Sequence, residues 1–175
     1  SSPEWSAYLR DELGLHVDAD RISALVVDHL LQGYRRALPL LPGAGQAVER
    51  LGGTWPLGLA SSSNREVIDE VLHVSGLGRR FAVTVSSEEV ARGKPAPDVY
   101  LETARRLGVP AGTCVAVEDS GNGIRSAVAA GMAVVAVPNP HFAPPAAVLA
   151  EAAAVVSHLD ELTVALVAGL VDGAA

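Results

Sequence analysis

The sequence predicts an α/β protein with a parallel sheet, preceded by a short all-helical segment. Two observations support this. From about residue 41 onward, short apolar runs rich in β-branched residues alternate with helical patterns, whereas only helical patterns occur before that point. Strands that alternate with helices of this length form βαβ units, and helices then cover both faces of the sheet.

Residues 1–40 are expected to be helical. One helix face carries residues at i, i+3, i+4 and i+7 spacing, namely Ile22, Leu25, Val26, His29, Leu30 and Gly33. Asp18-Ala19-Asp20 directly precedes this pattern, and we interpret it as the start of the helix. Pro39 and Pro42-Gly43 end the pattern and predict a boundary. The chain is therefore divided into residues 1–40 and residues 41–175.

Strands are predicted after this boundary at residues 55–60, 81–85, 114–118 and 133–137, with a weaker candidate at 153–156. Apolar residues at helical spacing lie between them, at 67–72, 100–107 and 124–128. This alternation justifies the parallel sheet.

Composition narrows the class of protein. The 175 residues, 49% of them hydrophobic, suffice for one domain with a small appendage. A net charge of −7 argues against nucleic acid or an acidic membrane as partner. The single cysteine, Cys114, allows no disulfide within the chain, and neither a signal-peptide pattern nor an apolar run of transmembrane length occurs. We expect a cytoplasmic monomer or homodimer.

Two adjacent carboxylates, Glu118 and Asp119, follow an apolar run and precede a turn rich in Ser and Gly. Ligand sites of parallel sheets gather at this end of the strands. Neighbouring anions repel each other unless a cation lies with them, and carboxylate oxygens suit Mg²⁺ better than zinc. The alternative is a pair of solvated carboxylates that cap the next helix. We interpret Gly121 and Gly123 as permitting a tight turn and a close helix–strand approach.

Lys94 lies between Gly93 and Pro95. The residue before a proline favours extended backbone, so Lys94 is expected on a stiff arm and outside any helix. A fixed positive charge next to a metal site would form a binding site for a phosphate. A surface lysine is the alternative.

The turn after the first predicted strand contains three serines. Ser63 with Glu66 predicts a capping box at the start of the next helix. Ser61 would then be a free hydroxyl at the strand tip, with the backbone N–H groups of the helix start behind it as an anion site. Turns of this kind also occur without any function.

In this order, the three segments resemble motifs of the haloacid dehalogenase (HAD) superfamily, in its capped phosphatase and β-phosphoglucomutase-like branch. Residues 60–63 are similar to the second motif, 93–98 to the third and 117–123 to the fourth, and Pro42-Gly43 resembles the return from cap to core. The resemblance extends from about Ser2 to Leu166. It implies a Rossmann-like parallel core at 41–175 and a partial helical cap at 1–40.

The family's first motif, Asp-x-Asp-Gly-Thr after an N-terminal strand, has no counterpart here. Asp18-Ala19-Asp20 leads into Arg21 instead. The resemblance implies that the central first strand, which lies between those at 55–60 and 114–118, is missing from this chain. Its absence would leave two exposed edges and a cleft. Either an N-terminal segment is not represented, or a partner supplies the strand.

The resemblance implies a Mg²⁺-dependent hydrolase of small phosphate monoesters, such as sugar phosphates, acting through an aspartyl-phosphate. Without the nucleophile, the 175 residues alone are expected to be inactive. The alternatives are a sugar-phosphate mutase of β-phosphoglucomutase type and a non-catalytic fragment or pseudoenzyme.

The candidate site residues fall into four groups, of which the first three follow from the resemblance. Ser61 and Lys94 are the catalytic candidates. Both would also bind the phosphate together with Ser62, and Glu118 and Asp119 would hold Mg²⁺. The candidates for lining the substrate are Arg35, Asn122 and Asn139, although Arg35 also fits a solvated helix face.

Overall fold

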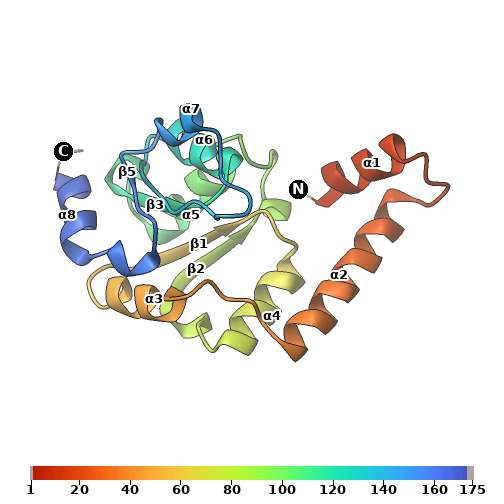
Figure 1. The fold of residues 1–175 in the computed structure, drawn as a ribbon, viewed down its shortest axis with the longest axis horizontal. Helices are drawn as coiled ribbons and strands as arrows, with labels where there is room; N and C mark the ends of the chain where they lie inside the picture. The colour runs from red at the N-terminus through yellow and green to blue at the C-terminus, as the bar shows by residue number, and fades with distance from the viewer. Residues whose placement is uncertain (1, 173–175) are drawn as a thin grey trace.

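The computed structural model describes residues 2–172. Helices α1 (Ser2–Glu12) and α2 (Ala19–Arg36) pack against each other beside the rest of the molecule, and α2 also contacts α4 (Arg65–Ser75) (Figure 1). Asp18 is the N-cap of α2, which confirms that Asp18-Ala19-Asp20 starts a helix. The division of the chain near residue 40 stays a prediction.

The predicted apolar face of α2 is only partly correct. Ile22 is buried, but Leu25 and Val26 are 51% and 37% exposed, and Val27 is buried instead. The reason is that α2 packs against α1 and α4 rather than along a sheet, so a full stripe of apolar residues has no core to cover.

The predicted strands all form, with small shifts at their ends, and every pairing is parallel. Strand β1 (Leu57–Ser61) pairs with β2 (Phe81–Ser86). A second sheet has the order β3-β4-β5, with β3 at Val115–Glu118, β4 at Ala133–Ala136 and β5 at Ala154–Val155. The predicted α/β fold with a parallel sheet is therefore confirmed.

Helices cover both faces of the strands. The first buried cluster contains residues of α5 (Asp98–Leu107) and α6 (Gly121–Ala129), and Val148 of the short helix α7 (Ala146–Leu149). The second contains residues of α3 (Ala44–Gly52) and α8 (Val164–Asp172). Single 3-10 turns at Gly78–Arg80, Ser87–Glu89, Ala111–Thr113 and Leu159–Glu161 complete the connections. Over residues 2–172, no helix has the length and apolar character needed to span a membrane.

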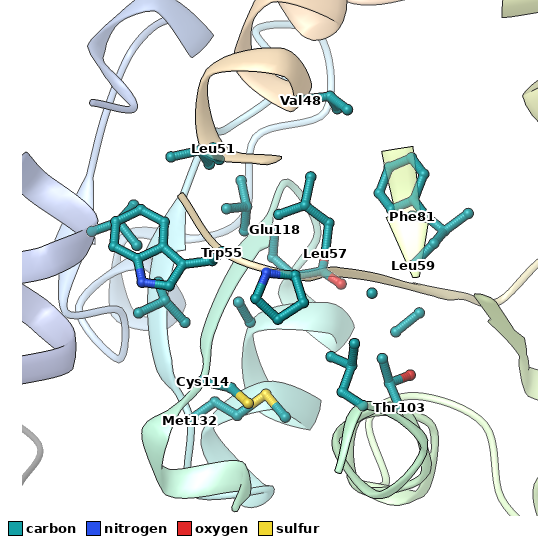
Figure 2. Close-up of a pocket in the computed structure, with 18 of the residues that line it drawn as sticks. Val48, Leu51, Trp55, Leu57, Leu59, Phe81, Thr103, Cys114, Glu118 and Met132 are labelled. Carbon is teal, nitrogen blue, oxygen red and sulfur yellow. The ribbon is translucent and has the colours of Figure 1, made fainter. Parts of the chain in front are cut away.

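Strands β1 and β3 belong to different sheets, and a cavity of about 610 Å³ lies between them. Figure 2 shows its mostly apolar lining, with Leu57 and Leu59 from β1, Thr103 from α5 and Leu51 from α3. Glu118 is the charged group on this lining. The structure thus has the expected cleft between these two strands.

Candidate active site

Lys94 joins the carboxyl ends of the two sheets. Its Nζ donates a hydrogen bond to the carbonyl oxygen of Ala60 in β1, at 3.2 Å, and forms an ion pair with Glu118 at the end of β3. The Lys94 side chain is only 10% exposed and that of Glu118 only 6%. The structure therefore brings the two charges together in a partly dehydrated setting, where their attraction is much stronger than in water.

The loop that carries Lys94 is fixed from both sides. Lys94 lies outside any helix, as predicted, and α5 begins only at Asp98. Ser126 in α6 donates a hydrogen bond to the carbonyl oxygen of Ala96, at 2.6 Å, and Arg92 pairs with Asp98 at 3.0 Å. These contacts hold the lysine between the strand ends.

Tyr100 is a third member of this cluster, and sequence reasoning missed it. Its hydroxyl donates a hydrogen bond to Oε1 of Glu118, at 2.5 Å, and accepts one from Lys94 Nζ at 3.4 Å. The lysine ammonium also lies 4.7 Å from the centre of the Tyr100 ring. In the sequence, Tyr100 only marks an apolar helix face, so no local pattern distinguishes it from a core residue.

The cluster keeps Glu118 ionised. Burial would raise its pKa, but the charge of Lys94 and hydrogen bonds from Lys94, Tyr100 and Ser120 outweigh that effect and lower the pKa below its usual value. Burial, followed by the negative charge of Glu118, raises the pKa of Tyr100, so its hydroxyl remains a donor. Asp119, the next residue, is exposed.

Gly123 makes room for Glu118. A Cβ at this position would lie 1.9 Å from Oε2 of Glu118, so a side chain and the carboxylate cannot share the space. Neither Gly121 nor Gly123 has a positive φ, so the short connection from β3 to α6 does not need the left-handed backbone of a glycine at these positions, and the close approach is specific to Gly123. Ser120 caps α6 by accepting a hydrogen bond from the Gly123 N–H, at 3.0 Å, and its hydroxyl donates to Oε2 of Glu118 at 3.2 Å.

The predicted capping box of Ser63 and Glu66 is wrong. The N-cap of α4 is Asn64, and Glu88 reaches over to accept hydrogen bonds from the Arg65 N–H, at 2.8 Å, and from Asn64 Nδ2, at 2.7 Å. A carboxylate far away in sequence thus takes the anion position at the start of this helix, which a three-residue pattern cannot reveal. Of the helix N–H groups expected to face a phosphate, that of Arg65 is therefore engaged by Glu88.

The serine turn is held by two buried serines at the end of β2 that sequence reasoning missed. Ser86 Oγ donates to the carbonyl oxygen of Ser63, at 2.7 Å, and Ser87 Oγ donates to that of Ser62, at 3.1 Å. Ser61 Oγ accepts a hydrogen bond from the Ser63 N–H at 3.1 Å. The Ser61 hydroxyl therefore keeps its own proton for another acceptor.

A second cavity, of about 590 Å³, opens beside Lys94 and is lined by Ser62 and Asn122, as well as by Arg125, which sequence reasoning did not single out. Two of the predicted lining residues are not among those that line it. Arg35 pairs with Glu70 of α4 at 2.8 Å, and Asn139 accepts a hydrogen bond from the backbone N–H of His141 at 2.9 Å. Both side chains are thus used to fix local structure.

The donor set of this site fits Mg²⁺ in part. Glu118 and Asp119 offer hard carboxylate oxygens at a strand end, and Mg²⁺ is usually held by one or two carboxylates together with water. Within residues 2–172, no group of three or more His, Cys, Asp or Glu side chains is placed to hold a metal. The two carboxylates would therefore hold the ion with water or with a further ligand.

The fold and the site define an α/β protein of the Rossmann-like class with a lysine–carboxylate pair at its strand ends. A family model of haloacid dehalogenase-like hydrolases matches residues 2–131, so the chain belongs to this family. This confirms the resemblance of the three motifs.

Individual relatives agree with this assignment. The chain is 43% identical to protein CbbY (plasmid) of Cupriavidus necator over 105 residues, which cover 58% of this chain and 41% of that protein. It is 43% identical to hexitol phosphatase B of Escherichia coli over 103 residues, which cover 58% of this chain and 46% of that protein. These matches span less than half of each curated relative. The fold is similar to that of β-phosphoglucomutase from Clostridium difficile, with a TM-score of 0.82, 20% identity, and coverage of 99% of this chain and 78% of that one.

Proposed function

We propose that this chain belongs to a Mg²⁺-dependent hydrolase of small phosphate monoesters, such as sugar phosphates. The observation that carries the proposal is the buried Lys94–Glu118 pair at the carboxyl ends of β1 and β3, beside the serine turn. Hexitol phosphatase B, to which the chain is similar, is a phosphatase by name. A cytoplasmic location and a monomeric or homodimeric state stay predictions.

The residues of the site have complementary tasks in this proposal. Lys94 neutralises the phosphate and the attacking carboxylate, which otherwise repel each other. Ser61 donates its remaining proton to a phosphoryl oxygen, and Ser62 lies on the cavity next to Lys94. Glu118 and Asp119 hold Mg²⁺, which supplies positive charge near the phosphoryl oxygens.

The nucleophile in this proposal comes from outside the 175 residues. The family's Asp-x-Asp-Gly-Thr motif follows a strand. In the part of the chain that the structure describes, the cavity between β1 and β3 is bounded by one unpaired edge of each strand. A parallel strand placed there would end beside Lys94 and Glu118. An aspartate at its tip could then attack the phosphate and form an aspartyl-phosphate, which water hydrolyses.

The test compares the 175-residue chain with a version extended by an N-terminal strand that ends in Asp-x-Asp-Gly-Thr. Both are assayed with para-nitrophenyl phosphate and with sugar phosphates, in Mg²⁺ and in EDTA. We expect phosphate release only from the extended version and only with Mg²⁺. The matched control is the extended version with its first motif aspartate changed to asparagine.

Three outcomes would contradict parts of the proposal. Metal-dependent turnover by the 175 residues alone would refute the external nucleophile. If the extended version folded but released no phosphate, the proposed phosphatase activity would be refuted. Isomerised sugar phosphate without net phosphate release would identify a mutase instead.

A further inference from the structure

We propose that Tyr100 is a positioning residue that holds Lys94 and Glu118 as one unit and thereby sets the metal affinity of Glu118. This inference rests on the proposed function, since that function assigns the metal to Glu118. It adds a residue from the first turn of a helix to charged groups that come from a strand end and a loop.

The first argument is the way in which Glu118 is held. Oε1 accepts hydrogen bonds from both Tyr100 and Lys94, while Oε2 accepts two from Ser120, one from its hydroxyl and one from its backbone N–H. Both oxygens of the carboxylate are therefore oriented, and Tyr100 supplies the neutral donor to Oε1, the oxygen that also pairs with Lys94. Partners of this kind, one step removed from a metal, fix the ligand's direction and tune its affinity.

The second argument is the way in which Lys94 is held. A lysine side chain is a flexible four-carbon stem, so a fixed ammonium needs several contacts. Tyr100 supplies two of them, through its hydroxyl at 3.4 Å and through its ring at 4.7 Å. The carbonyl oxygen of Ala60 supplies another at 3.2 Å. Without Tyr100, the ammonium loses the surface against which it lies.

The third argument is that Tyr100 itself cannot move easily. It lies in the first turn of α5, is 7% exposed, and belongs to the buried cluster that also contains Val85 and Ile124. The helix and this packing fix the ring, so its hydroxyl acts as a rigid reference point for the two charged side chains.

The chain offers a clear reporter, because Lys94 is the only lysine among its 175 residues. In protein labelled with ¹⁵N-lysine, a single side-chain ammonium signal therefore reports on this site without any metal. Affinity for Mn²⁺, used as a probe in place of Mg²⁺, is measured on the same protein by paramagnetic resonance of the free ion.

We expect Tyr100→Phe, which keeps the ring and removes the hydroxyl, to weaken Mn²⁺ binding about 10- to 100-fold. It should also shift the Lys94 signal. The matched control is Thr103→Val, one turn further along α5, which removes a buried hydroxyl bonded to the Val99 carbonyl oxygen at 2.7 Å. This control should lower the unfolding temperature but leave Mn²⁺ affinity and the Lys94 signal unchanged.

Unchanged Mn²⁺ affinity or an unchanged Lys94 signal in Tyr100→Phe would overturn the inference. So would a failure of the unsubstituted chain to bind Mn²⁺ at millimolar concentration, or an equal effect of Thr103→Val on both readouts. None of these measurements involves turnover, so missing phosphatase activity would count against the proposed function alone.

Discussion

At the scale of single residues, the burial of the Lys94–Glu118 pair has consequences for stability as well as for activity. Removing one partner of a buried ion pair leaves an uncompensated charge, whereas replacing both partners by neutral groups is often tolerated. The two side chains are 10% and 6% exposed, so this asymmetry applies to them.

Lys94→Met should therefore lower the free energy of unfolding by about 3–5 kcal/mol, the usual cost of leaving a buried charge without its partner. The double variant Lys94→Met with Glu118→Gln should recover part of this loss, because the remaining group is then neutral. Denaturant unfolding of the single and double variants at pH 7 measures both effects. Equal stability of Lys94→Met and the unsubstituted chain would mean that Glu118 is hydrated rather than buried.

Substitutions of Lys94 should also lower the turnover of the extended version. Lys94→Ala should lower turnover roughly 10²–10³-fold, as expected when a preorganised charge partner is lost. Lys94→Arg should rescue poorly, because a planar guanidinium does not replace a compact ammonium between Ala60, Tyr100 and Glu118. Steady-state kinetics on sugar phosphates measure this, and near-normal turnover of Lys94→Ala would remove Lys94 from the phosphate site.

Gly123→Ala tests the close approach of Glu118. The added Cβ would lie 1.9 Å from Oε2 of Glu118, so the carboxylate must leave its partners. We expect a loss of about 1–3 kcal/mol in the free energy of unfolding, as for other overpacked sites, together with weaker Mn²⁺ binding. Gly121→Ala is the matched control, since its Cβ would only reach ordinary contact with Val148 at 3.6 Å. Equal behaviour of the two variants would contradict the role given to Gly123.

At the scale of elements, a network of ion pairs joins α4, α5 and the turn after β2. Glu89 accepts a hydrogen bond from the Ser86 N–H, at 2.9 Å, and pairs with Arg65 of α4 and, at 2.7 Å, with Arg106 of α5. The Ser86 hydrogen bond is the largest cause of its low pKa. Together with the two arginines it outweighs partial burial and lowers the pKa from 4.5 to about 2.

Glu89 should accordingly stabilise the fold in a pH-dependent way. Because its pKa is lower in the folded state, the stabilisation is fully present above about pH 4.5 and is lost as the pH falls towards about 2. Glu89→Gln should lower the unfolding temperature at pH 7, and the difference should shrink over this acid range. Glu49→Gln, which breaks an exposed pair with Arg80 at 3.0 Å, should change little at any pH. If the difference in unfolding temperature between Glu89→Gln and the unsubstituted chain stayed constant over this pH range, the stabilising role given to ionised Glu89 would be contradicted.

At the scale of the whole molecule, the main feature is the cavity that separates the β1–β2 sheet from the β3–β4–β5 sheet. Within residues 2–172, strands β1 and β3 each have one edge without a paired strand, and both edges face an apolar cavity. Exposed edges of this kind accept a further strand. Lys94 connects the two sheets at the carboxyl ends of β1 and β3. Helix α5 packs against β1 and β2.

An added N-terminal strand should therefore protect both edges from hydrogen exchange. In the extended version, amides of β1 and β3 should exchange more slowly than in the 175-residue chain, because their free edges become paired. Strand β4 is the internal control, since β3 and β5 already flank it. Mass spectrometry of exchanged peptides measures this, and protection at β4 alone would show that the new strand lies elsewhere.

Much of the fold followed from local patterns. The strands and the start of α2 are set by apolar periodicity and by an N-cap residue, which act over a few residues. The extended arm expected at Lys94 is instead a turn, in which the Ala96 N–H donates a hydrogen bond to the carbonyl oxygen of Gly93 at 3.0 Å. The order of the three motifs identified the family, and the missing first motif predicted the gap between β1 and β3.

Contacts between distant segments were decided only by the tertiary structure. The Tyr100–Glu118 hydrogen bond, the capping of α4 by Glu88 and the placement of Arg35 on Glu70 join residues that are many positions apart. Sequence alone determined which residue types stand at the strand ends, because turns and strands are specified locally. Which of those charges meet depends on how helices pack on the two sheets, and packing is a property of the whole chain.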